Sequence, residues 1–228
     1  MTEITVSVDL RPTFGLARDQ GPRPTCLAFA ASDTHAAVRE GWMPLSCEYA
    51  FYQAQRRAGR HPNTGAVLSS MLEALREDGQ PEESGWPYLP ATPADAASWT
   101  PPREVGDLFG RNGVTAEYSV DRIIWELDQG RPMIVLMMLS RAFYQPAHLS
   151  IINPASDEQP EPAQRHAVIA AGHGAIDGQR AILVRNSWGP EWGDAGYGWL
   201  TERFLGPRLY AAATLLEEID VSAHSAAV

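Results

Sequence analysis

The sequence contains no lysine: all 18 basic residues among its 228 are arginine, against 28 acidic residues. The absence of lysine excludes a Schiff-base or lysine-nucleophile mechanism supplied by this chain. The net charge is −10, and no cluster of basic residues is visible. Because affinity for nucleic acid comes from neutralising phosphates with such clusters, we expect no nucleic-acid partner.

Cysteine is nearly absent as well, since only Cys26 and Cys47 occur. A secreted domain held together by disulfides contains more, so we expect a reducing compartment. No run of 18 apolar residues occurs, and the N-terminal residues lack the basic start and apolar stretch of a secretory signal. We therefore predict a cytoplasmic protein that does not span a membrane.

Several catalytic and binding motifs are missing too. The chain has no His-Glu-x-x-His motif, Walker loop, dinucleotide fingerprint or Gly-x-Ser-x-Gly elbow. His173 lies seven residues after His166, an odd offset that places two side chains on opposite faces of a strand and argues against a metal pair. We therefore expect neither a metal nor an organic cofactor.

Helical patterns dominate the first half of the chain and strand patterns the second. Apolar residues spaced by three and four predict helices over residues 26–40, 46–57, 67–77 and 120–128. Alternating or β-branched runs predict strands over residues 4–10, 114–118, 133–139, 166–172, 181–186 and 209–215. The stretch 81–102 is rich in proline and alanine and indicates a boundary between two lobes. This order predicts an α+β protein with two lobes.

Cys26 stands at the start of the first predicted helix, with Thr25 as the expected N-cap. Cysteine attacks as thiolate, so a catalytic cysteine needs a partner that favours the ionised form. A helix end supplies on the order of 1 kcal/mol, whereas pairing with histidine supplies roughly 7 kcal/mol. His166, which lies 140 residues later in a predicted strand, is the candidate partner. We predict Cys26 as nucleophile and His166 as general acid and base.

Three further residues complete the candidate site. Asn186 ends the next predicted strand and can orient the His166 ring, while Trp188 can keep water off that hydrogen bond. Gln20 lies six residues before Cys26 and can donate to the oxyanion of a tetrahedral intermediate. Losing one such donor typically costs ~3 kcal/mol of transition-state stabilisation.

Over nearly its whole length the chain resembles papain-like cysteine peptidases. The matching segments are Asp19-Gln20-Gly21, Cys26 with Ala28-Phe29, Leu45-Ser46, Gly65 with Leu72 and Gly79, Trp86-Pro87-Tyr88, His166-Ala167-Val168, Asn186-Ser187-Trp188-Gly189, Trp192-Gly193 and Gly196-Tyr197-Gly198. The resemblance implies a papain-like two-lobe fold, with a helical lobe, a β-barrel-like lobe and the active site in the cleft between them. It also implies Cys26 as nucleophile, His166 as general acid and base, Asn186 as the orienting residue and Gln20 as the oxyanion donor.

The two lobes form a single catalytic unit in this prediction. We place the helical lobe at about 14–112, the β lobe at about 1–13 and 113–220, and a flexible tail at 221–228. Only 19 residues precede Gln20, so we expect no inhibitory propeptide.

The surroundings of the nucleophile depart from the family pattern. Cys-Gly-Ser-Cys-Trp is replaced by Arg23-Pro24-Thr25-Cys26-Leu27, which removes a disulfide cysteine and agrees with a cytoplasmic location. Bacterial relatives often vary here, so we expect a bacterial, disulfide-poor member. Cys47 is expected to be a buried thiol.

The expected substrate-binding residues are Gly65, Ala66, Arg165 and Trp188. The resemblance lays an extended substrate across the Gly65 loop, where Ala66 replaces a second glycine. Arg165 stands where many relatives have Asp, Asn or Gly. This arginine either favours an acidic substrate side chain or faces solvent.

Our leading hypothesis is a cysteine endopeptidase that hydrolyses a protein or peptide substrate through a thioester at Cys26. One alternative passes the same acyl group to an amine, as a transpeptidase or ligase. The other is a peptide-binding pseudopeptidase that has lost efficient turnover. An activating or regulatory protein partner stays open.

Overall fold

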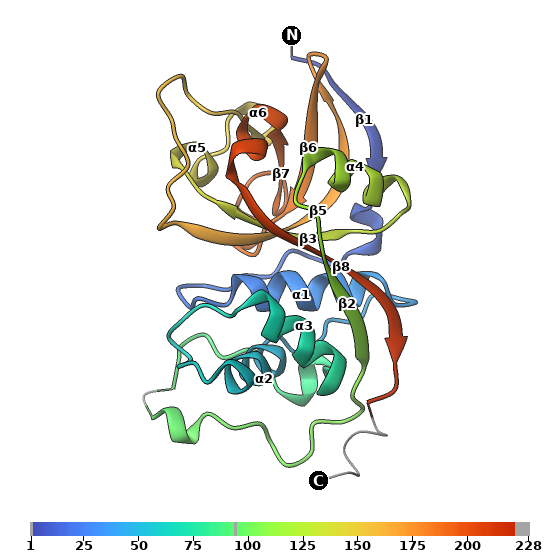
Figure 1. Cartoon of the computed structure of the whole chain (residues 1–228), viewed down its shortest axis with the longest axis vertical. Helices are drawn as coiled ribbons and strands as arrows, with labels where there is room; N and C mark the ends of the chain where they lie inside the picture. Colours follow the sequence, from blue (N-terminus) through green and yellow to red (C-terminus); the bar gives the residue numbers. More distant parts are fainter. Residues whose placement is uncertain (1, 94, 222–228) are drawn as a thin grey trace. The chain divides into compact units, whose positions relative to one another are not determined.

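The backbone passes between a strand-rich part and a helix-rich part at Asp19, near Val114 and again near Thr214. The computed structural model describes residues 2–93 and 95–221 (Figure 1). Within the described residues, the strand unit comprises 2–19 and 115–214, and the helix unit comprises 20–114 and 215–221.

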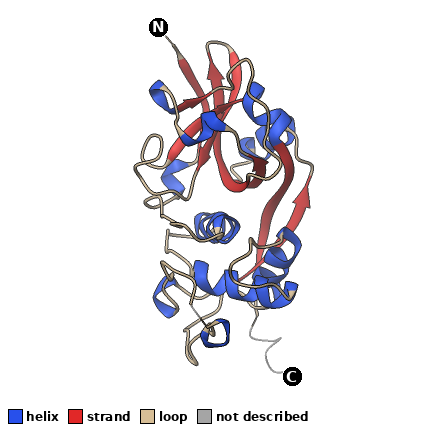
Figure 2. Ribbon diagram, turned by 90° about the vertical axis from the view of Figure 1, so that its left-hand side faces the viewer, coloured by secondary structure: helices blue, strands red, loops and turns tan. Residues whose placement is uncertain are grey.

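The sheet of the strand unit is built around β5, which pairs with β1, β3 and β6. Figure 2 shows the strands of the chain in red. The order is β8-β3-β5-β6-β7-β4, with only β4 and β7 parallel among the pairs named here. The strands are β1 (Ile4–Asp9), β3 (Met133–Met138), β4 (Ile151–Ile152), β5 (Arg165–Ile176), β6 (Gln179–Arg185), β7 (Tyr197–Thr201) and β8 (Leu209–Ile219). Asp177 and Gly178 join β5 to β6, and both have positive φ, as a two-residue hairpin turn requires.

The core of this unit is formed by buried apolar residues of β3, β5, β6 and the helix α4 (Val120–Asp128), together with residues of β7, β8 and two short helices, α5 (Arg141–Tyr144) and α6 (Glu202–Leu205). Ser119 caps α4 by accepting a hydrogen bond from the Arg122 backbone N–H, and Ile123 and Leu127 are fully buried. Five of the six residues of β3 are buried, which explains why its sequence is a continuous apolar run without alternation.

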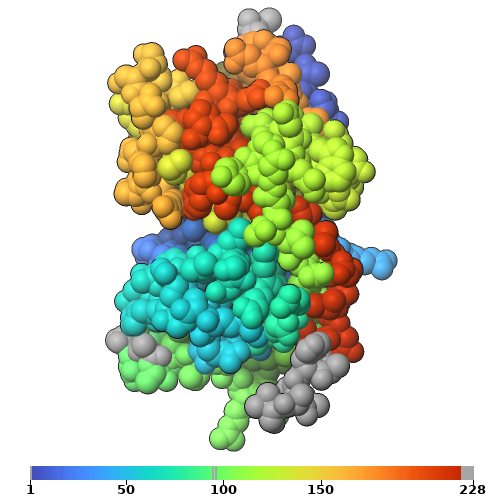
Figure 3. Space-filling model, in the orientation of Figure 1, coloured from blue at the N-terminus to red at the C-terminus, as the bar shows by residue number. Residues whose placement is uncertain are grey.

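The helix unit contains α1 (Cys26–Ala37), α2 (Cys47–Ala58) and α3 (Leu68–Glu77). Residues 27–36 of α1 are all buried, so this helix is not an amphipathic surface helix. In contrast, α2 and α3 cover much of the visible face of this unit in Figure 3. Strand β2 (Gly110–Ala116) lies beside the part of β8 beyond Thr214, where Arg111 donates to the Leu216 carbonyl.

The observed helices and strands follow the predictions closely, with a few differences. Helix α1 ends at Ala37 rather than near residue 40, β2 starts four residues before the predicted 114, and β5 and β8 are longer. The sequence patterns missed β4, β7, α5 and α6. Five 3-10 turns were also missed: Arg11–Thr13, Glu83–Gly85, Ala96–Ser98, His148–Ser150 and Gly206–Arg208.

The unit boundaries also differ from the predicted lobes of 14–112 and 113–220. Residues up to Asp19 belong to the strand unit, because the buried Arg185 guanidinium donates to the carbonyls of Gly15 and Leu16, and Asp19 bridges to Trp188. The last part of β8 belongs to the helix unit. Of the predicted tail 221–228, Val221 is buried and residues 222–228 lie outside the described residues.

No helix in the described part of the chain is long and apolar enough to cross a membrane.

Candidate active site

Cys26 is the first residue of α1 and is partly exposed. Thr25 occupies the N-cap position, as predicted, but its side chain does not cap the helix. The Thr25 hydroxyl instead shares a 2.9 Å hydrogen bond with the Tyr88 hydroxyl. The sulfur of Cys26 therefore sits at the positive end of a helix that lacks a side-chain cap, which favours the thiolate. Cys47, in contrast, is fully buried at the start of α2.

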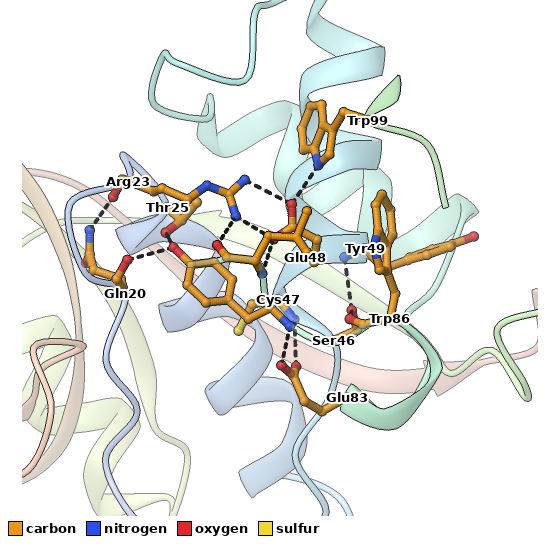
Figure 4. A network of polar contacts seen from close by, with 12 residues as sticks. Gln20, Arg23, Thr25, Ser46, Cys47, Glu48, Tyr49, Glu83, Trp86 and Trp99 are labelled. Carbon is orange, nitrogen blue, oxygen red and sulfur yellow. Dashed lines mark hydrogen bonds and ion pairs between the residues drawn. The ribbon is translucent and has the colours of Figure 1, made fainter. Parts of the chain in front are cut away.

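Gln20 is buried in the turn that precedes α1. Its side-chain Nε2 donates to the Arg23 carbonyl over 2.8 Å, and its own backbone carbonyl accepts a 2.6 Å hydrogen bond from the Tyr88 hydroxyl (Figure 4). Tyr88 thus contacts both Gln20 and Thr25, and burial raises the pKa of its phenol. A primary amide has two N–H groups, and the hydrogen bond to the Arg23 carbonyl accounts for one of them.

Gly65 and Ala66 lie in the loop before α3, with Gly65 exposed and Ala66 partly buried. A Cβ placed on Gly65 would come within 4.0 Å of the Pro24 carbonyl oxygen, so this loop is next to the turn that leads to Cys26. Gln55 holds the loop from α2: its Nε2 contacts the carbonyls of His61 and Thr64 at 2.8 and 2.7 Å. The helix unit therefore brings Gln20, Cys26 and Gly65 together.

His166 and Asn186 meet in the strand unit, at the second residue of β5 and just beyond β6. The imidazole Nε2 and the Asn186 Oδ1 are 2.7 Å apart, and both side chains are buried. The backbone N–H of Ser187 also donates to Oδ1, which fixes this atom as the acceptor. Nε2 must then carry the ring hydrogen, so Nδ1 is the nitrogen left to exchange a proton.

Asn186 is held by the Gly196 carbonyl, which accepts its backbone N–H at 2.9 Å. Gly196 has φ 87°, and a Cβ there would lie 2.2 Å from the Ala17 side chain. Only glycine satisfies both conditions. Gly196, the first glycine of the Gly196-Tyr197-Gly198 segment, therefore supports Asn186, the residue that orients His166.

Burial lowers the pKa of His166 from 6.5 to about 4, and the hydrogen bond to Asn186 opposes part of this shift. The imidazole is therefore neutral when it has no anionic partner. A thiolate next to the ring would stabilise the imidazolium and raise this pKa again.

Aromatic rings surround the imidazole. The Trp188 ring centroid lies 4.8 Å from that of His166, and the Phe143 centroid lies 5.7 Å away. Trp192 donates its Nε1–H to the Phe143 carbonyl and so fixes the short helix α5. Trp188 is a predicted site residue. Phe143 was not predicted, because α5 is only four residues long and shows no periodic pattern.

Arg165 begins β5 and is exposed. Its Nε donates to the Pro162 carbonyl at 3.3 Å, and its guanidinium lies 5.3 Å from the centre of the Tyr210 ring. The strand unit therefore contains four of the predicted site residues: Arg165, His166, Asn186 and Trp188. Among the described residues, no group of three or more His, Cys, Asp or Glu side chains could hold a metal ion.

A family model described as papain family cysteine protease matches residues 6–204. The chain belongs to this family. The match confirms the predicted family and makes the chain a member of a family of hydrolases.

Relatives in the papain family share moderate sequence identity with the chain. Cysteine proteinase 3 of Entamoeba histolytica is 31% identical over 199 residues, which cover 84% of this chain and 61% of that protein. Cysteine proteinase 2 of the same organism is 28% identical over 187 residues, covering 79% and 58%. The chain thus spans about three fifths of the length of the curated relatives it matches.

Solved structures of papain-family proteases share the fold. Xylellain, a cysteine protease from Xylella fastidiosa, aligns with a TM-score of 0.73 and 21% identity, covering 93% of this chain and 86% of that one. The Carica candamarcensis cysteine protease CMS1MS2, solved in complex with E-64, aligns with a TM-score of 0.69 and 18% identity, covering 94% and 99%. The predicted α+β papain-like fold is therefore confirmed.

Proposed function

We propose that this chain is a cysteine endopeptidase that hydrolyses peptide bonds of a protein or peptide substrate through a thioester at Cys26. The observation that carries the proposal is the His166–Asn186 hydrogen bond, which occupies Nε2 and leaves Nδ1 as the nitrogen for the thiol. A histidine held in this tautomer is what a papain-family nucleophile requires.

In the proposed reaction the Cys26 thiol first gives its proton to Nδ1 of His166. The thiolate then attacks the carbonyl carbon of the scissile peptide, and the resulting oxyanion accepts hydrogen bonds from the Cys26 backbone N–H and the Gln20 amide. His166 returns the proton to the leaving amine, and the C–N bond breaks to leave the thioester. A water molecule, deprotonated by His166, attacks the thioester and releases the acid product and the thiol.

The remaining predicted residues have supporting roles in this proposal. Trp188 shields the His166–Asn186 hydrogen bond from water, and Gly65 with Ala66 contacts the substrate backbone. Arg165 is proposed to favour an acidic side chain in the substrate. Cleavage of matched peptides that differ only by Glu and Gln tests this preference, and equal rates would mean that Arg165 serves only to stack on Tyr210.

Labelling with iodoacetamide near pH 5.5 tests the thiolate directly, because an ordinary thiol with a pKa of about 8.5 is almost unreactive there. We expect rapid labelling of Cys26 in the wild type and slow labelling in His166→Ala. In the variant, the labelling rate of Cys26 should recover near pH 9. The buried Cys47 reports on unfolding in the same experiment. Equal labelling rates for the wild type and His166→Ala would overturn the pairing.

Peptide-library cleavage by the wild type and Cys26→Ala tests the activity itself. We expect products only from the wild type, so products from both proteins, or from neither, would contradict it. Products joined to an added amine would instead indicate the transpeptidase or ligase alternative, and tight peptide binding without products would indicate the pseudopeptidase. The cytoplasmic location, bacterial origin and regulatory partner stay predictions.

A further inference from the structure

A buried ion pair joins the turn before α1 to the helix α2. The Arg23 guanidinium donates to both carboxylate oxygens of Glu48, with Nη1–Oε2 at 2.5 Å and Nη2–Oε1 at 2.9 Å. The two side chains are only 2% and 0% exposed. The paired donors of the guanidinium match the two carboxylate oxygens, so the pair has a defined orientation.

Glu48 accepts two further hydrogen bonds, which complete its partners inside the helix unit. Trp99 donates its indole N–H at 2.6 Å, and the Leu89 backbone donates at 3.0 Å (Figure 4). The Arg23 guanidinium also donates to the Leu89 carbonyl at 2.7 Å. The four donors compensate for the desolvation of the buried Glu48 carboxylate. Removing either charge alone would leave the other charge buried without its partner.

The same arginine contacts the predicted oxyanion donor through its backbone. The Arg23 carbonyl accepts the Gln20 side-chain N–H at 2.8 Å and the Thr25 backbone N–H at 2.9 Å. One residue therefore connects Glu48 on α2 to the Gln20 amide and to the residue that precedes Cys26. A shift of the guanidinium would move the carbonyl that both groups depend on.

We propose that the buried Arg23–Glu48 ion pair, with Trp99 as an added donor, positions the Gln20 amide for the oxyanion. This inference rests on the proposed function, because it assigns a role to the same site. Arg23 and Glu48 are positioning residues that act through Gln20 and do not touch the substrate. Removing the pair should weaken stabilisation of the transition state, which lowers kcat and leaves KM nearly unchanged.

The test removes both charges at once, since a single substitution would leave the other charge buried and unpaired. The variant R23M/E48Q keeps an amide oxygen for the Trp99 and Leu89 donors. The matched control is R180Q/E202Q, which removes the exposed Arg180–Glu202 ion pair of the strand unit. The urea unfolding curve of each variant shows whether it is folded.

A mutant cycle with Gln20→Ala separates positioning from general stability. We expect R23M/E48Q to lower kcat about tenfold and Gln20→Ala about a hundredfold. Their combination should be within about twofold of Gln20→Ala alone, because the pair acts through that amide. Multiplied losses in the combined variant would overturn the proposal, as would a similar kcat loss in the control.

Two further measurements test the positioning role of Arg23 and Glu48. Amide hydrogen exchange over residues 20–26 should accelerate in R23M/E48Q but not in the control, and unchanged exchange would overturn the positioning role. This readout needs no activity, so it still decides the inference if the wild type cleaves no peptide and the proposed function fails. If R23M/E48Q does not fold, Trp99→Phe removes a single donor to Glu48, and an unchanged kcat in that variant would contradict the proposal.

Discussion

The Nε2–H of His166 donates to Oδ1 of Asn186 over 2.7 Å, in a buried setting where the Ser187 backbone holds the acceptor in place. This hydrogen bond opposes the effect of burial, which lowers the pKa of His166 to about 4. The imidazolium that the proposed reaction needs is therefore stabilised by one neighbour and disfavoured by the surrounding apolar rings. Removing the hydrogen bond and exposing the ring to water should therefore shift the pH dependence of activity in opposite directions.

Asn186→Ala should lower kcat by roughly 10- to 100-fold, because the ring loses its orientation. The hydrogen bond raises the pKa of His166, so its loss lowers that pKa further. The enzyme form with an imidazolium is then lost at lower pH, and the basic limb of the kcat/KM profile should move to lower pH. A profile with an unmoved basic limb would remove Asn186 from the mechanism.

Trp188→Ala should move the same limb in the opposite direction. The Trp188 ring lies against the imidazole, and burial is the largest cause of its lowered pKa. Exposing the ring to water raises the pKa of His166 toward its ordinary value, so the basic limb should move to higher pH. Trp125→Ala is the matched control, because that tryptophan lies on α4 and is 48% exposed. Equal shifts in the two variants would contradict the shielding role.

Gln55→Ala should raise KM for extended peptides by a few fold and leave kcat nearly unchanged. Gln55 is 1% exposed and holds the carbonyls of His61 and Thr64, just before Gly65. Its loss should also cost about 1–3 kcal/mol of unfolding free energy, because two backbone carbonyls each lose a hydrogen bond. Steady-state kinetics and urea unfolding measure the two effects, with the exposed Gln159→Ala as control. An unchanged KM would show that Gln55 has only a structural role.

Acid should destabilise the protein through His35. Burial lowers the pKa of this histidine from 6.5 to about 3, and its Nδ1 lies 3.1 Å from the Gln80 Oε1. The unfolded chain takes up a proton below about pH 6.5 while the folded chain does not, so stability is full above that pH and falls toward pH 3. His35 alone should contribute about 2 kcal/mol to the loss of stability between pH 7.5 and 5.

Urea unfolding of the wild type and His35→Gln at both pH values measures this contribution. The variant should be less stable at pH 7.5, but its stability should fall less on acidification than that of the wild type. An identical fall in both proteins would show that other groups cause the acid sensitivity.

The helices and strands were predictable where a local pattern decides them. Helix α4 has the predicted bounds, because Ser119 caps it and its apolar residues repeat at helical spacing. Strand β7 was missed, because Tyr197–Thr201 is short and contains Gly198, where a Cβ would come within 2.8 Å of the Trp192 ring. Such a segment becomes a strand only when β6 offers its backbone for pairing.

By itself, the sequence determined the family and named its chemically distinctive residues, because Cys26, His166 and Asn186 each stand in a recognisable local segment. It did not reveal what holds them. The sequence showed Arg23 only as the residue that replaces a family cysteine, and it did not single out Glu48. Only the tertiary structure decided that these two charges are buried against each other, because burial and pairing depend on residues that folding brings together from distant positions. The same reason explains why Phe143, far from His166 in sequence, became visible as its neighbour only in the folded chain.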